Sequence, residues 1–153
     1  MERSIYSLFL IILTLSFCQP EPAELQKRWK AHSVEIRNGA DAEFARVIQK
    51  EAYLDLRVPF NFYGRIPESD GMSAHHNRMS SVAGVSSIEL NDTIDKLELN
   101  LTYAKPPSLK GEEQRFALHN PSAESITITF VINETSGDGS YSVTFQPVNS
   151  GAN

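Results

Sequence analysis

The 153-residue chain contains one cysteine, Cys18, and one tryptophan, Trp29. With a single cysteine no disulfide can form within the chain, so its stability must come from packing, although small secreted domains often rely on disulfides. The longest uncharged apolar run, from Ile5 to Phe17, would reach only about 20 Å as a helix, against a hydrocarbon core of ~30 Å. Internal repeats and low-complexity tracts are also missing, which excludes solenoids and disordered tails.

The motifs of several enzyme classes are missing as well. The chain has no G-x-S-x-G, no H-E-x-x-H and no glycine-rich phosphate loop, so the sequence favours a non-catalytic role and indicates no cofactor. Residues 21–51 hold six basic and six acidic side chains, whereas residues 52–153 hold seven and twelve. Because the body is acidic, it lacks the basic stripe with which proteins bind nucleic acid.

The first residues have the order of a secretory signal. Arg3 is followed by the apolar run from Ile5 to Phe17, and the chain then becomes polar at Gln19-Pro20-Glu21-Pro22. A basic start and 7–15 apolar residues are typical of a signal peptide rather than of a spanning helix. We predict a signal peptide over residues 1–17 and an attachment site with a tether over residues 18–24.

Leu15-Ser16-Phe17-Cys18 resembles the lipobox of bacterial lipoproteins, although that family usually has a small residue where Phe17 stands. The resemblance implies that Cys18 becomes the lipidated first residue of the mature chain. It also implies attachment to a membrane of the bacterial cell envelope, with the outer membrane as the expected place. The alternative is ordinary cleavage after Cys18, which would release a soluble secreted domain without cysteine.

Residues 25–52 are predicted to be helical. Leu25, Trp29, His32 and Ile36 follow one another at steps of four, three and four, which indicates a helix from Ala23 to about Arg37. The alternative is that the stretch "HSVEIR" forms a short strand. Asp41 is a predicted N-cap for a second helix, "AEFARVIQKEA". Its expected apolar stripe consists of Phe44, Val47 and Ile48.

After Ala52 the apolar period changes from about 3.6 to 2, as in "LDLRVPF", "LELNLTY", "SITITFVI" and "YSVTF". Pro59 cannot donate to a ladder, so the first of these strands should end there or lie at an edge. We predict that the fold is mainly β, with a single antiparallel β-sandwich over residues 53–153 after one or two N-terminal helices. Its spacing is similar to that of immunoglobulin-like sandwiches. The polar residues 64–84 are predicted to be one long loop.

His75 and His76, with Asp70 and Glu68, are the strongest candidates for a metal site, and His119 could join them from a strand end. Zinc requires three or four converging ligands, and adjacent histidines in an extended loop point apart. A solvated polar loop is therefore the simpler interpretation. A small metal-dependent hydrolase that uses this loop remains an alternative function.

Two further patterns have structural explanations. Asn133, Glu134 and Asp138 could offer oxygen ligands to calcium, but their spacing differs from that of the EF-hand loop and a hairpin turn explains them equally well. Three N-x-S/T triplets begin at Asn91, Asn100 and Asn133. These would be glycosylation acceptors in a eukaryotic secretory pathway and would have no meaning for a bacterial lipoprotein.

Trp29 lies among the basic residues Lys27, Arg28 and Lys30. A basic helix with a tryptophan near a lipid anchor could rest on an anionic membrane. We favour the other interpretation, in which Trp29 packs into the body of the protein. Together the patterns predict an exported, lipid-anchored envelope protein with a non-catalytic binding or structural role and a possible protein partner.

Overall fold

The computed structural model describes residues 19–68, 77–132 and 139–148, and within these ranges the chain is mainly β with one α-helix. The helix is α2 (Ala42–Glu51), and two short 3-10 helices are η1 (Pro22–Leu25) and η2 (Pro107–Leu109). The strands are β1 (Arg28–Arg37), β2 (Tyr53–Asp55), β3 (Asn61–Pro67), β4 (Met79–Asn91), β5 (Lys96–Lys105), β6 (Glu113–Ala117), β7 (His119–Ser122), β8 (Ser125–Val131) and β9 (Ser140–Pro147).

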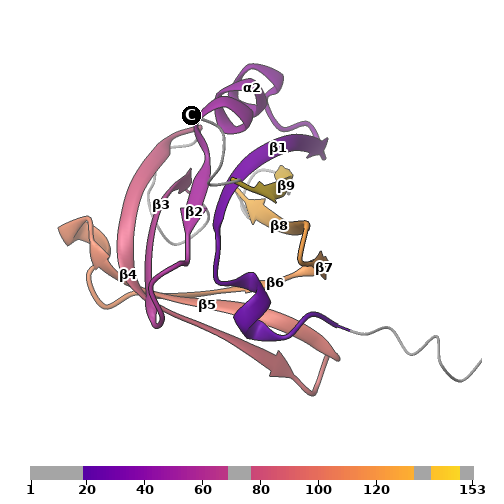
Figure 1. Cartoon of the computed structure of the whole chain (residues 1–153). Coiled ribbons are helices and arrows are strands. Elements are labelled where there is room, and N and C mark those ends of the chain that lie inside the picture. Colours follow the sequence, from indigo (N-terminus) through magenta and orange to yellow (C-terminus); the bar gives the residue numbers. More distant parts are fainter. Residues whose placement is uncertain (1–18, 69–76, 133–138, 149–153) are drawn as a thin grey trace, which may run out of the picture.

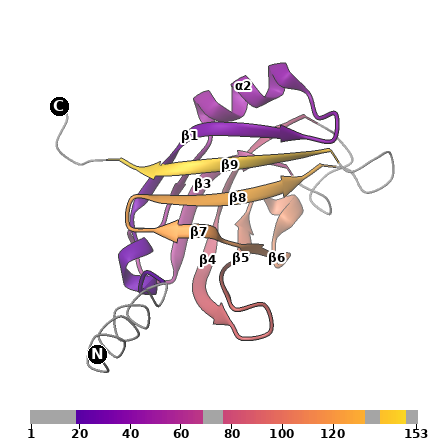
Figure 2. The same cartoon turned by 90° about the vertical axis from the view of Figure 1, so that its right-hand side faces the viewer.

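All nine strands belong to one antiparallel sheet, in the order β6-β5-β4-β3-β2-β1-β9-β8-β7. The two edge strands, β6 and β7, are separated along the chain by Leu118 alone. The Leu118 N–H extends the β5–β6 pairing by donating to the Leu97 carbonyl at 2.8 Å. Because one bent segment supplies both edges, the sheet curls until it is nearly barrel-shaped (Figures 1 and 2).

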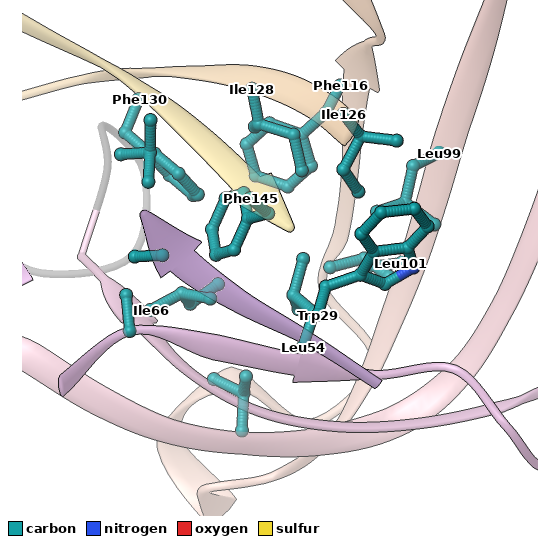
Figure 3. Packing of buried hydrophobic residues seen from close by; sticks show 14 of the residues in the cluster. Trp29, Leu54, Ile66, Leu99, Leu101, Phe116, Ile126, Ile128, Phe130 and Phe145 are labelled. Atoms are coloured by element: carbon teal, nitrogen blue, oxygen red, sulfur yellow. The ribbon is translucent and has the colours of Figure 1, made fainter. Parts of the chain in front are cut away.

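The concave side of the sheet holds the core (Figure 3). As the period of two predicts, one face of each of β5, β8 and β9 is buried, and Trp29, Phe130, Tyr141 and Phe145 are at most 1% exposed. Burying a side chain of this size stabilises a fold by about 1.5–3 kcal/mol. The indole N–H of Trp29 donates to the Leu25 carbonyl at 2.9 Å, so the preferred interpretation of Trp29 as a core residue is confirmed.

Helix α2 begins where the sequence predicts. The Asp41 carboxylate caps it by accepting two backbone N–H groups of the first turn, at 2.7 and 3.1 Å. Of the expected apolar stripe, Phe44 and Ile48 are buried, whereas Val47 is exposed. The Phe44 ring meets the edge of the core residue Tyr141, with centroids 5.6 Å apart. The helix is therefore joined to the core through its first turn.

The helix covers a gap in the sheet. β1 pairs with β2 only over Arg28–Lys30, so the remainder of β1 lacks a strand on that side. The Ala31 N–H donates instead to the Ala52 carbonyl at 3.0 Å, and Gln49 Nε2 donates to the His32 carbonyl at 2.7 Å. Residues at the end of α2 thus satisfy the backbone groups that a neighbouring strand would otherwise pair.

Three predictions need correction. The helix predicted from Ala23 to Arg37 is wrong, because this stretch forms η1 and then strand β1, and the alternative of a strand over residues 32–37 is confirmed. The predicted loop over residues 64–84 is wrong at both ends, since β3 continues to Pro67 and β4 begins at Met79. The immunoglobulin-like sandwich is not confirmed, because the described strands form one curled sheet.

The two ends of the curled sheet differ. The described chain starts at Gln19, whose Nε2 donates to the Asp95 carbonyl in the β4–β5 turn at 3.3 Å. Because neighbouring strands are antiparallel, the β2–β3, β4–β5 and β7–β8 turns share this end, which we call the tether end. The end of β3 and the start of β4 lie at the opposite end, the distal end. In both views α2 is at the top and the β4–β5 turn is at the bottom (Figures 1 and 2).

Candidate functional site

Glu68 is a buried carboxylate at the distal end, directly after β3. Its side chain is 8% exposed, and Ser80 Oγ donates to Oε1 at 2.6 Å. The Arg78 Nε lies 3.7 Å from the same oxygen, which is an ion-pair distance but not a hydrogen bond. The backbone supports this arrangement, because the Glu68 N–H donates to the Arg78 carbonyl at 2.8 Å.

The second carboxylate oxygen of Glu68 is unsatisfied. Oε2 is buried and has no hydrogen-bond partner among the described residues. A buried polar atom without a partner costs about 1–3 kcal/mol, and more when the group is charged. Native structures contain few such atoms, and each requires an explanation, such as local strain, an ordered water or a bound ion or ligand.

A hollow of about 520 Å³ adjoins Glu68. Its lining combines one acidic side chain, one basic side chain and three hydroxyls with a few apolar groups: Glu68, Arg78, Met79, Ser80, Ser81, Pro106, Ser108 and Leu109. The Arg78 side chain is 63% exposed, so its guanidinium can turn from Glu68 toward a ligand. The hollow therefore offers a carboxylate for a cationic group and a guanidinium for an anionic one.

The predicted metal cluster is not assembled in the described part of the chain. Asp70, His75 and His76 lie outside the described residues, and Glu68 alone of that group is placed. His119 begins β7 and lines a hollow at the tether end, so it does not join Glu68. Among residues 19–68, 77–132 and 139–148, no three His, Cys, Asp or Glu side chains come together as a metal site would require.

The tether-end hollow has a volume of about 450 Å³ and contains His119, Asp95 and Lys96 with Gln19. Burial lowers the pKa of His119, and the positive charge of Lys96 lowers it further. The imidazole is therefore held neutral over a wider pH range than a free histidine. Because Gln19 forms part of the wall, this hollow lies next to the predicted attachment point at Cys18.

The remaining sequence candidates are placed as follows. Cys18, with the whole predicted signal peptide, and the proposed calcium ligands Asn133, Glu134 and Asp138 lie outside the described residues. Asn100, which opens one of the three triplets, lies within β5, and its Oδ1 is buried. A buried amide of this kind is a poor glycosylation acceptor, since the modification needs a surface position.

The pairing of Glu68 with Ser80 and Arg78 was missed because the sequence placed all three in one loop. They come together because β3 and β4 are adjacent and antiparallel, with Pro67 opposite Met79.

Comparison with known proteins adds no precedent: no family model, curated protein or solved structure matches the chain. No helix in the described ranges is long and apolar enough to cross a bilayer.

Proposed function

We propose that the protein is exported, anchored through lipid on Cys18 in the bacterial cell envelope, and that it binds a polar partner group non-catalytically in the Glu68 hollow. The outer membrane is the expected location, and a soluble secreted domain cleaved after Cys18 is the alternative. A small metal-dependent hydrolase that uses the 64–84 loop is the second alternative, and its candidate ligands Asp70, His75 and His76 lie outside the described residues.

The observation that carries the binding role is the unsatisfied Oε2 of Glu68 beside an open hollow. An ammonium or guanidinium group would supply the missing donor, and Arg78 could at the same time receive a carboxylate. The ligand class that fits is therefore a basic amino acid or the basic end of a peptide. The hydroxyls of Ser80, Ser81 and Ser108 could accept or donate the remaining hydrogen bonds.

Binding can be tested by NMR titration of the purified protein with L-arginine, with L-glutamate as the charge-reversed probe. We expect the backbone amide signals of Ser80 and Ser81 to shift with arginine, and we expect Glu68→Gln to abolish the shift. Glu35→Gln is the matched control, because Glu35 pairs with Arg37 at 3.3 Å and neither residue lines the hollow. No shift with arginine, or an equal loss in both variants, would refute this site.

The anchor is tested by the intact mass of the protein recovered from the membrane fraction of its host. A mature chain that begins at Cys18 and carries diacylglyceryl and acyl groups would support the proposal, and Cys18→Ser should prevent the modification. A lipid-free chain that begins at Gln19 would favour the secreted alternative. The two tests are independent, so the anchor and the hollow can fail separately.

A further inference from the structure

Exposed apolar side chains gather at the tether end. Of the ten large apolar residues that are exposed in the described chain, five lie at this end: Val58, Phe60, Leu90, Ile94 and Val148. These five are 44–75% exposed, whereas Ile36 and Val131 at the distal end and Val47 on α2 are 37–39% exposed. Single exposed apolar residues are ordinary, but several that gather at one end of a molecule mark an interaction surface.

Phe60 is the most exposed of them, at 75%, and it ends the β2–β3 turn, directly before β3. Its φ of 62° lies in the left-handed region, which is costly for an aromatic residue and suits Gly or Asn. A turn optimised for stability alone would place one of those residues here. Strain of this kind is typically kept where a side chain serves a function.

The N-terminal segment lies between the two apolar turns. Gln19 is hydrogen-bonded to Asp95, next to Ile94, and Pro22 lines a hollow of about 300 Å³ together with Phe60 and Ile88. In the sequence Cys18 directly precedes Gln19, which is the first described residue. A lipid on Cys18 would therefore hold this end of the protein against the bilayer.

We propose that the tether end is a membrane-contacting face, in which Phe60, Val58, Leu90 and Ile94 enter the lipid interface beside the anchor. The inference rests on the proposed lipidation of Cys18. A single acyl chain binds only marginally, so additional apolar contacts would strengthen the attachment and fix its orientation. With this end on the membrane, the Glu68 hollow at the distal end faces away from it.

The charges at this end indicate that the contact does not depend on anionic lipid. Arg57 is paired with Asp55 at 2.6 Å, and this pairing lowers the pKa of the Asp55 carboxyl. Lys27, Arg28 and Arg57 line one hollow at this end together with Glu124 and Val148. Near the β4–β5 turn the exposed Asp92 and Asp95 outnumber Lys96, so the basic charges at this end are offset by acidic ones. Apolar insertion should therefore occur in zwitterionic as well as anionic bilayers and should change little with salt.

The test uses the mature lipidated protein reconstituted into phosphatidylcholine vesicles, with and without phosphatidylglycerol. Since Cys18 is the only cysteine and would be blocked by lipid, Phe60→Cys or Ile94→Cys provides a single site for a fluorescent label. Spin-labelled phosphatidylcholine should quench about half of the emission at either position, as expected for a face buried about 5–10 Å into the interface. Ile36→Cys at the distal end is the matched control and should remain unquenched.

The outcomes separate the inference from the function on which it rests. If the wild-type protein does not float with the vesicles, the lipid anchor fails. If it floats but the labels at positions 60 and 94 are quenched no more than the label at 36, the membrane-contacting face is refuted while the anchor stands. Quenching that requires phosphatidylglycerol would overturn the apolar mechanism in favour of charge. The two positions lie in different turns, so local misfolding of one variant leaves the other as evidence.

Discussion

The hydroxyl of Tyr141 joins helix α2 to the core, and its removal gives a direct test of the described packing. The Asp41 N–H donates to this hydroxyl at 2.8 Å. The hydroxyl proton in turn lies within reach of the Asp41 carbonyl at 3.1 Å and of Asn77 Oδ1 at 3.3 Å. The ring itself is fully buried, so Tyr141→Phe keeps the packing and removes two hydrogen bonds.

Two hydrogen bonds contribute about 0.5–1.5 kcal/mol each, so Tyr141→Phe should lower the free energy of unfolding by about 1–3 kcal/mol. Urea titration followed by circular dichroism measures this change. With an m-value of about 1.5 kcal/mol per molar, within the usual range for small domains, a loss of 2 kcal/mol lowers the midpoint by roughly 1.3 M. The m-value itself should be unchanged, because the variant exposes the same surface when it unfolds.

Tyr63→Phe is the matched control, because Tyr63 is 57% exposed on the outer face of β3. Its removal should change the unfolding free energy by less than about 0.5 kcal/mol. If Tyr141→Phe is no more destabilising than Tyr63→Phe, then the hydroxyl does not hold α2, and the account of how the helix is joined to the core is refuted.

Two further predictions concern strand packing and pH. A Cβ at Gly84 would meet the Thr102 carbonyl oxygen, so Gly84→Ala should destabilise by about 1–3 kcal/mol or more in the same urea assay. Gly139→Ala, whose Cβ would meet nothing closer than 3.6 Å, should cost less than about 0.5 kcal/mol, and equal effects would contradict the reasoning. Burial raises the pKa of the Tyr103 and Tyr141 hydroxyls, so the unfolded chain loses these protons first, at about pH 10. The free energy of unfolding should therefore be constant below that pH and decrease above it. In Tyr103→Phe the decrease should be less steep, because one of the two hydroxyls is missing. A urea midpoint that stays constant between about pH 9 and 11 would contradict this prediction.

The strands after residue 95 could be predicted because each has one apolar face and a clear turn on either side. Leu97, Leu99 and Leu101 alternate with polar residues and all three are buried. The same pattern did not distinguish one curled sheet from two stacked ones. Both architectures bury one face of each strand, and the difference depends on which distant strands pair, as β1 does with β9.

Strand β1 was mistaken for a helix because a bulge alters its period. The pairing of β1 with β9 shifts register between Ala31 and Ser33. The residues that face the core are therefore Trp29, Ala31 and then Val34, at steps of two and three rather than two and two. Once the strict alternation is lost, the spacing resembles that of a helix, although His32, which the helix would have placed on its apolar face, is exposed.

The loop predicted over residues 64–84 was too long for a related reason. The loop was predicted from the polar composition of this stretch, yet its limiting residues, Gly64 and Gly84, both lie inside strands. A Cβ at Gly64 would come within 2.9 Å of the Tyr53 carbonyl oxygen, so glycine is required there by the close approach of β2. Strand glycines of this kind permit the curvature by which the sheet closes.

The candidate site depended on this correction. As members of a loop, Glu68, Arg78 and Ser80 had no reason to meet, and Glu68 was considered only as a metal ligand beside His75 and His76. As residues that follow β3 and begin the return strand, they face one another across adjacent chains. The sequence could therefore indicate the region but not the pair of charges within it.

The placement of that pair relative to the N-terminus limits how the protein could work. Gln19 is fixed at the tether end by its bond to Asp95, and β3 runs from the Phe60 turn at that end to Glu68 at the other. A strand of seven residues spans about 23 Å, so a bilayer at the tether end would leave the hollow roughly that far from the lipid surface. This distance would allow a soluble partner, or the basic end of a peptide, to reach Glu68 without competing with the membrane. If instead the ligand were a lipid headgroup, the hollow would lie at the wrong end of the molecule.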